Sequence, residues 1–202
     1  MYLRFGKRIF DIIASSLGLM VCLPLFGLVG VLIKASSPGP IFFKQERLGQ
    51  YCKPFRLIKF RTMQVDEASY QKQFTPGDEN RITWIGKFLR RTKLDELPEL
   101  VNVLMGHMSF VGPRPEVPKY LDGYKERFSR VLQIKPGITD YATIKYRNEE
   151  EVLAECADPE WTYLNKILPD KLELNQKYLD NISFFTDLKI LSSTLLRVFL
   201  KG

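Results

Sequence analysis

An apolar stretch near the N-terminus constrains the fold of this chain more than any other feature. From Ile9 to Ile33 nearly every residue is apolar, and the exceptions are Asp11, two serines and small residues. A straight helix of about 22 residues is about 33 Å long, which is enough to cross the hydrocarbon core of a bilayer. A cleaved signal peptide is a poor alternative, because the stretch is too long and no small-residue cleavage site follows it. Hydropathy alone therefore predicts a membrane-spanning helix.

Two features of the same stretch instead favour a segment that enters and leaves the membrane by one face. Pro24 lies in its middle, where proline removes a backbone hydrogen bond and kinks a helix. Lysine and arginine flank both ends, and the positive-inside rule places both flanks on the cytoplasmic side. A helix–break–helix with its break at Pro24 satisfies both observations. Within it, Asp11 could pair with Lys7 or Arg8 and would then not lie unpaired in lipid.

The charge balance also suits a membrane surface. The chain has 30 Lys+Arg against 23 Asp+Glu, a formal net charge of +7. Such an excess favours nucleic acid, an anionic membrane or a phosphorylated substrate. The basic residues do not form one tract with interleaved aromatic residues, so nucleic acid is not an expected partner. The three cysteines show no metal-binding or CxxC spacing, which favours a reduced, cytosol-facing protein.

The strongest chemical signal is the stretch TKLDELPELVNVLMGHMSFVGPRP at residues 92–115. It opens with Asp95 and Glu96, and apolar residues at helical spacing follow, which predicts a short buried helix. Pro98 suits the first helical position. The two carboxylates then precede a helix start, where free backbone N–H groups and the helix dipole favour their ionised form. Taken alone, a plain capping role is the simpler explanation for them.

The end of this stretch favours a catalytic role for Asp95 and Glu96 over a capping role. Gly112 permits a turn, and Pro113 and Pro115 hold the backbone around Arg114 extended. An arginine mounted so rigidly can bind phosphate through two parallel hydrogen bonds. A carboxylate nucleophile with fixed cations nearby suits covalent phosphoryl transfer.

The two halves together, LDELPEL at 94–100 and MSFVGPRP at 108–115, resemble the monotopic bacterial phosphoglycosyl transferases. This is the bacterial sugar transferase family, which starts polyprenol-linked glycan assembly, and the resemblance covers nearly the whole chain. It implies transfer of a sugar-1-phosphate from a UDP-sugar to a polyprenol phosphate, with undecaprenyl phosphate expected. The reaction would release UMP at the cytoplasmic face of the bacterial inner membrane. The resemblance further implies that Asp95 forms a glycosyl-phospho-aspartate and that Asp95 holds Mg²⁺ with Glu96 close by.

Three more basic residues become candidate substrate contacts. Lys59 begins KFRTM at 59–63, which matches a signature of the family and suggests a phosphate or carboxylate partner near the nucleophile. Arg90 aligns with an arginine that is prominent in the family, and Arg147 is a candidate contact to the nucleotide or sugar. For each, an ordinary solvated side chain is the alternative. His107, the only histidine, is expected to be peripheral because relatives carry aspartate at its position.

The chain departs from the family pattern in two further places. Members usually carry Ser-Pro at the membrane break, where this chain has Leu23-Pro24. A serine hydroxyl there could have satisfied a freed carbonyl. Many members read PGITG where residues 136–140 read PGITD, a variant found in a subset of the family that could bear on which sugar is accepted.

The remaining segments complete the predicted fold. Residues 41–43 and 55–63 predict a short β-hairpin, and the polar, aperiodic residues 64–80 predict a loop. Residues 141–146 alternate in polarity and predict an extended segment. Residues 182–200 are apolar with a basic polar face, which predicts an interfacial helix, with a buried core helix as the equal alternative.

We therefore predict an α+β chain: a mostly helical small domain with a short β-hairpin, a re-entrant membrane segment and interfacial amphipathic helices. Residues 1–40 form the membrane segment and its exit turn, and residues 41–202 form a cytosol-facing catalytic domain that contacts membrane lipid. The competing class is a non-catalytic, single-pass membrane-anchored protein in which Asp95 and Glu96 cap a helix and Arg114 pairs structurally. The sequence predicts no particular sugar or oligomeric state.

Overall fold

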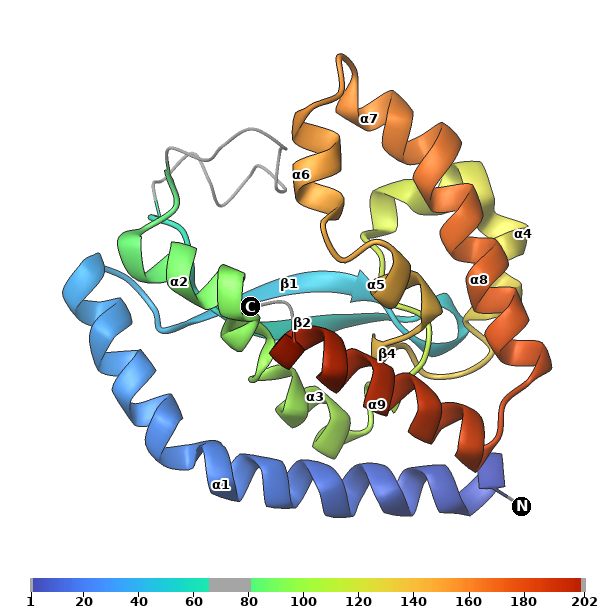
Figure 1. The fold of residues 1–202 in the computed structure, drawn as a ribbon, viewed down its shortest axis with the longest axis horizontal. Coiled ribbons are helices and arrows are strands. Elements are labelled where there is room, and N and C mark those ends of the chain that lie inside the picture. Colours follow the sequence, from blue (N-terminus) through green and yellow to red (C-terminus); the bar gives the residue numbers. More distant parts are fainter. Residues whose placement is uncertain (1, 66–80, 201–202) are drawn as a thin grey trace.

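The computed structural model describes residues 2–65 and 81–200, and the loop predicted for residues 64–80 lies outside them from residue 66 on. The described residues are mostly helical, with two short two-stranded sheets (Figure 1). This arrangement confirms the predicted α+β class. In chain order the helices are α1 (Lys7–Ser36), α2 (Trp84–Thr92), α3 (Glu99–Met105), α4 (Leu121–Val131), α5 (Tyr141–Lys145), α6 (Glu149–Ala154), α7 (Pro159–Thr162), α8 (Leu168–Asp180) and α9 (Phe184–Leu200).

The two sheets differ in how far apart their strands lie in the chain. The strands are β1 (Phe42–Leu48), β2 (Pro54–Phe60), β3 (Ser109–Val111) and β4 (Gly137–Thr139). β1 and β2 pair antiparallel and form the predicted hairpin. β3 and β4 pair in parallel, which the sequence did not predict. This second pair joins the end of the 92–115 stretch to the last third of the chain.

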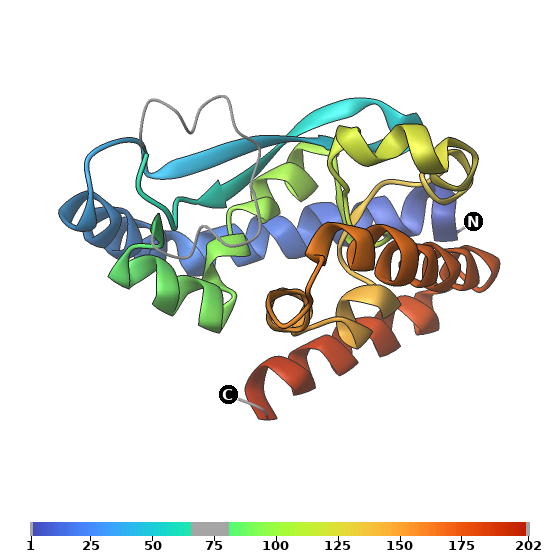
Figure 2. The ribbon, with the colours of Figure 1, turned by 90° about the horizontal axis from the view of Figure 1, so that it is seen from above.

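The buried apolar side chains form separate clusters. One joins α4, α6 and α8 through Phe128, Leu153 and Leu172. A second joins the end of α1 to β2 and α2, and a third joins β2 to α3. Figure 2 shows the hairpin and α9 on opposite sides of the molecule. Strand β2 therefore packs against both helices that flank the predicted catalytic carboxylates.

Helix α1 is continuous through Pro24, so the predicted break is a change of direction in an unbroken helix (Figure 1). Among the described residues it is the one helix long and apolar enough to cross a membrane. Only 17% of its most apolar stretch is buried, unlike the core helix of a soluble protein. Its 30 residues correspond to about 45 Å, more than a bilayer core requires.

Both ends of α1 pack against the same protein body. Its first half buries Lys7, Asp11 and Ser15, and its second half buries Val29, Gly30 and Ile33. Between these contacts, Met20 and Val21 are 73% and 77% exposed. A straight span would place its two ends on opposite faces of the membrane. One compact body that holds both ends fits a segment that enters and leaves by the same face.

The partner predicted for Asp11 is wrong. Its Oδ1 accepts hydrogen bonds from the Ser109 hydroxyl at 3.0 Å and from the Phe110 backbone N–H at 3.1 Å, at the start of β3. Arg8 donates to two carbonyls near the end of α3, at 2.7 and 2.8 Å, and Lys7 pairs with α9. The carboxylate is satisfied, as expected, but by groups about a hundred residues away.

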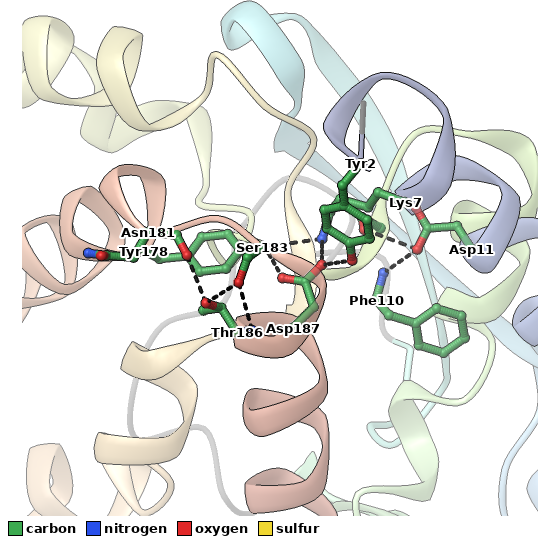
Figure 3. Close-up of polar contacts among 10 residues, drawn as sticks. Tyr2, Lys7, Asp11, Phe110, Tyr178, Asn181, Ser183, Thr186 and Asp187 are labelled. Atoms are coloured by element: carbon green, nitrogen blue, oxygen red, sulfur yellow. Dashed lines mark hydrogen bonds and ion pairs between the residues drawn. The ribbon is translucent and has the colours of Figure 1, made fainter.

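The ion pair of Lys7 with Asp187 anchors α1 to α9 (Figure 3). Asp187 also accepts hydrogen bonds from the hydroxyls of Tyr2 and Tyr178, each at 2.5 Å. Lys7, Tyr178 and Asp187 are all buried. The start of α1 is thus fixed to the junction between α8 and α9.

Breaking this buried pair should destabilise the protein. Asp187→Asn removes the countercharge of Lys7, and an unpaired buried charge costs about 3–5 kcal/mol in free energy of unfolding. Thermal unfolding followed by circular dichroism in detergent measures the effect. The control is Glu160→Gln, which breaks the exposed pair with Lys119 and should change stability by less than about 0.5 kcal/mol. Equal effects of the two substitutions would contradict this account of the anchor.

The extended segment predicted for residues 141–146 is wrong, because residues 141–145 form helix α5. Asp140 starts that helix: its Oδ1 accepts a hydrogen bond from the Thr143 backbone N–H at 2.5 Å. Helix α9, in contrast, has features of both predicted alternatives: one of its faces is buried as in a core helix, and the other is exposed and apolar as in an interfacial helix. It buries Ile190 near β3, β4 and α5, and it leaves Phe185 and Leu188 exposed.

Candidate active site

The two carboxylates lie in a single turn between α2 and α3. This 3-10 turn (Leu94–Glu96) precedes Pro98, and α3 begins at the next residue, as the sequence predicted to within one position. Asp95 is 9% exposed. The turn therefore presents both carboxylates at the start of a helix in a largely dehydrated setting.

Glu96 is held by two cations. The guanidinium of Arg114 contacts both carboxylate oxygens, with Nη2 on Oε1 and Nη1 at 3.4 Å from Oε2. Lys59 Nζ donates to Oε1 at 2.8 Å. Burial alone would raise the pKa of Glu96, but Arg114 and Lys59 hold it well below its usual range. Glu96 is thus ionised, and the two cations are fixed beside it.

Asp95 is in a different state from its neighbour. Its Oδ1 is buried and has no hydrogen-bond partner among the described residues. Burial raises the pKa of Asp95 and the charge of Glu96 adds to this, while Lys59, Lys93 and Arg90 oppose it. The net shift is upward, opposite to the direction expected from the helix start. A buried carboxylate oxygen without a partner has its bonding capacity left for a substrate or a metal ion.

Glu99, which no sequence motif singled out, shares Lys59 with Glu96. Its Oε1 lies 3.3 Å from Lys59 Nζ, and only 2% of the residue is exposed. Burial raises the pKa of Glu99 to about 7, although Lys59 opposes the shift. The site therefore contains a third carboxyl group, and the pKa of this group lies above its usual range.

A second missed residue, Asn102, fixes Lys59 in position. Its amide accepts a hydrogen bond from the Ile58 backbone N–H at 3.0 Å and donates to the Arg56 carbonyl at 2.8 Å. These bonds fasten α3 to β2 directly beside Lys59. The signal that could have revealed Glu99 and Asn102 is their spacing, because two polar residues three apart share one face of an otherwise apolar helix.

The main chain around Arg114 is held by hydrogen bonds to β4 in addition to the two flanking prolines. The Gly112 N–H donates to the Thr139 carbonyl at 3.0 Å, and the Gly137 N–H donates to the Pro113 carbonyl at 2.9 Å. A Cβ atom at Gly112 would lie 2.6 Å from a backbone oxygen, so only glycine permits this approach. The main chain that carries Arg114 is therefore clamped from both sides.

Asp140 completes this clamp. Its carboxylate is fully buried, with Oδ2 accepting from the Arg114 backbone N–H at 3.2 Å and Oδ1 capping α5. This residue is the departure from the PGITG pattern noted in the sequence. The Asp140 carboxylate binds the backbone N–H of Arg114, whereas the guanidinium of Arg114 binds Glu96.

Asp140→Ala should therefore weaken both stability and activity. It removes a helix cap worth about 1 kcal/mol and leaves a buried N–H unsatisfied, at about 1–3 kcal/mol. Urea unfolding measures the first effect, and release of UMP, the product that the family resemblance implies, measures the second. The matched control is Asp158→Ala, which removes the exposed cap of α7 and should cost only the first contribution without affecting turnover. Identical behaviour of the two variants would refute a role for Asp140 in mounting Arg114.

The other predicted site residues fall into two groups. Arg90 Nε donates to the Thr62 hydroxyl at 3.0 Å and lies close enough to Asp95 to lower its pKa. Arg147 donates to the Arg197 carbonyl in α9 and not to the carboxylates. His107 is exposed, in agreement with the expected peripheral position. The structure brings together Lys59, Arg90, Asp95, Glu96 and Arg114.

Asp95 and Glu96 provide only part of a Mg²⁺ site. Within residues 2–65 and 81–200 no three His, Cys, Asp or Glu side chains form a metal cluster. Mg²⁺ bound with substrate phosphates needs only one or two carboxylates, and the buried Asp95 Oδ1 suits one such ligand. Both oxygens of Glu96 are engaged by cations, so Glu96 would have to give up a contact to bind metal.

Comparisons with known proteins identify sugar transferases that are similar over most of this chain. A sugar transferase of Bacillus subtilis, named as uncharacterized, is 43% identical over 195 residues, which are 95% of this chain and 86% of the relative. A UDP-glucose:undecaprenyl-phosphate glucose-1-phosphate transferase of Escherichia coli is 34% identical over 200 residues, 97% of this chain. A UDP-N-acetylgalactosamine-undecaprenyl-phosphate N-acetylgalactosaminephosphotransferase of Aeromonas hydrophila is 34% identical over 201 residues, 98% of this chain.

This chain spans only 40% of the Escherichia coli relative and 44% of the Aeromonas hydrophila relative. The family model for bacterial sugar transferases, in contrast, matches residues 2–201. The match includes the turn with Asp95 and Glu96, both sheets and the clamped Arg114. The chain therefore belongs to the bacterial sugar transferase family.

Proposed function

We propose that this enzyme transfers a sugar-1-phosphate from a UDP-sugar to a polyprenol phosphate, which we expect to be undecaprenyl phosphate. The observation that carries the proposal is the state of Asp95: a buried carboxylate with an unpartnered oxygen, beside cations that Glu96 holds in place. A carboxylate that only capped a helix would have its oxygens bonded to backbone N–H groups. The names of the two longer relatives support the donor and acceptor classes.

In the first step a carboxylate oxygen of Asp95 attacks the β-phosphorus of the UDP-sugar. The bond from that phosphorus to the bridging oxygen breaks, and UMP leaves with the electron pair. The sugar phosphate remains on Asp95 as a glycosyl-phospho-aspartate. Removing most water from the carboxylate favours this attack, because a poorly solvated anion is a stronger nucleophile.

In the second step a phosphate oxygen of the polyprenol phosphate attacks the same phosphorus. The bond to Asp95 breaks, its carboxylate is restored, and the product is a polyprenol diphosphate sugar that starts a glycan or glycoconjugate. A water-soluble donor and a lipid acceptor thus use one site in turn. The acceptor needs no general base, because its phosphate is already ionised at neutral pH.

Fixed cations make both attacks possible. An anionic nucleophile and an anionic diphosphate repel each other strongly at low dielectric constant, and positive groups already in place offset this repulsion. Glu96 is the residue next to the nucleophile, and it binds both Lys59 and Arg114. These contacts hold the two cations close to Asp95. Asp95 would hold Mg²⁺, with Glu96 close by, and the ion would supply further positive charge near the reacting phosphates.

We further propose that the enzyme works at the cytoplasmic face of the bacterial inner membrane, with α1 as a re-entrant segment in contact with membrane lipid. The packing of both ends of α1 against one body supports this topology. Cysteines introduced at the two ends of α1 should then react with an impermeant thiol reagent from the same side. Reaction from opposite sides would exclude the re-entrant topology.

A panel of UDP-sugars tests the reaction itself. Purified protein is incubated with each donor, Mg²⁺ and undecaprenyl phosphate, and released UMP is measured. We expect release with at least one donor, and a matching lipid-linked sugar in the organic phase. No release from the whole panel would favour the competing class, a non-catalytic membrane-anchored protein.

A further inference from the structure

Residues 181–183 join α8 to α9 and form an elbow that local hydrogen bonds hold together. An open groove lies beside this elbow. The Ser183 hydroxyl accepts a hydrogen bond from the Thr186 backbone N–H at 3.1 Å, and the Thr186 hydroxyl donates to the Asn181 carbonyl at 2.7 Å (Figure 3). The groove has a volume of 380 Å³. It is lined by Tyr141, Lys177, Asn181, Phe185, Thr186 and Lys189. None of these residues belongs to the carboxylate site.

The charge of the groove is positive. Lys177 and Lys189 are exposed, and neither forms an ion pair within residues 2–65 and 81–200. Among the residues that the structure describes, no acidic side chain lines the groove. Two ammonium groups with nearby hydroxyl and amide groups are suited to a phosphate, because a compact anion can accept from all of them.

The wall of the same groove is apolar at Phe185. This side chain is 79% exposed, as much as Met20 and Val21 in the middle of α1. On the same helix Leu188 is 51% exposed. Large apolar side chains so exposed mark a surface that meets lipid or protein. Aromatic residues beside lysines are typical of the level where acyl chains meet phosphate headgroups.

The polar cluster at Asp187 places this groove at the level where α1 enters the membrane. Asp187 binds Lys7 and Tyr2 at the start of α1 and lies two residues from both Phe185 and Lys189 (Figure 3). Asp187 points inward and is 4% exposed, whereas Phe185 and Lys189 point outward. The elbow therefore lies beside the entry of the membrane segment, with its cationic and apolar groups available to a lipid.

We propose that this groove binds an anionic phospholipid of the bilayer, with the headgroup phosphate between Lys177 and Lys189 and the acyl chains along Phe185. The proposal rests on the membrane location argued above, and it assigns a lipid site that shares no lining residue with the carboxylate site. The bound lipid sets how deeply α9 inserts into the membrane. Because Asp187 binds Lys7, the lipid also sets the depth at which α1 begins. Each lysine at an anionic surface strengthens binding by roughly five-fold.

Titration calorimetry of the full-length protein in neutral detergent micelles tests the site, with dihexanoylphosphatidylglycerol as the probe. We expect saturable binding that weakens by roughly 25-fold in Lys177→Gln/Lys189→Gln, from five-fold for each lysine. The control is Lys53→Gln/Lys125→Gln, which removes two exposed lysines elsewhere and should leave binding unchanged. Dihexanoylphosphatidylcholine and inorganic phosphate are titrated in parallel, and both should bind more weakly than the anionic lipid.

Unchanged affinity in the groove variant would overturn the proposal. So would equal binding of phosphatidylcholine, or of inorganic phosphate alone, since the site would then not select an anionic lipid. UMP release is measured in the same preparations. Lipid binding without UMP release would contradict the proposed reaction but not the lipid site. UMP release without lipid binding would contradict the lipid site but not the proposed reaction.

Discussion

Asp95→Asn should abolish UMP release from every UDP-sugar that the enzyme accepts, by at least about 10⁴-fold. The amide has almost the shape of the carboxylate but cannot attack phosphorus or leave from it. The fold should not suffer, because burial raises the pKa of Asp95 and a neutral group suits the position at least as well. The expected result is therefore an inactive protein with unchanged or slightly raised thermal stability.

Asp158→Asn, at the exposed cap of α7, is the matched control and should retain full activity. Substantial UMP release by the Asp95 variant would remove this residue from the chemistry. Loss of activity together with loss of folding would leave it only a structural role. Retained folding without turnover is the outcome that a nucleophile requires.

Arg114→Ala should have the second largest effect, and it should affect both stability and activity. It leaves Glu96, whose side chain is only 16% exposed, with Lys59 as its remaining close cation. Breaking a buried pair costs about 3–5 kcal/mol, and we expect the lower end because 32% of the Arg114 side chain is exposed. Loss of one fixed cation at the reacting phosphates should also slow UMP release by about 10²–10³-fold.

Arg114→Lys separates charge from geometry. Lysine keeps the positive charge but cannot contact both oxygens of Glu96 in parallel, so we expect intermediate stability and activity. Urea unfolding and initial rates of UMP release on the same preparations measure both. An alanine variant as active as the lysine variant would show that the clamp on Glu96 does not serve catalysis.

Local sequence patterns were sufficient to predict the hairpin, α3 and the apolar α1. Each of these depends on periodicity, prolines or turn residues within a short window. The alternation of residues 141–146 predicts an extended segment, and this prediction is wrong because Asp140 caps a helix there. A single side chain that accepts from the Thr143 N–H decides that helix.

The missed parts of the site depend on contacts between distant segments. The parallel pairing of β3 with β4 involves only three residues in each strand, yet it brings Asp140 to the backbone of Arg114. Asp11 likewise finds its partners 98 and 99 positions away. No local pattern signals such contacts, whereas the helical spacing of Glu99 and Asn102 did contain a usable signal.

The most direct test of the central claim is the mass of the intact protein after incubation with the UDP-sugar and Mg²⁺ but without polyprenol phosphate. We predict that the mass increases by one sugar phosphate, that peptide mapping places the increase on Asp95, and that added undecaprenyl phosphate removes it. Turnover by the complete system with no such adduct at any time would mean a direct transfer between donor and acceptor, and would contradict the covalent mechanism.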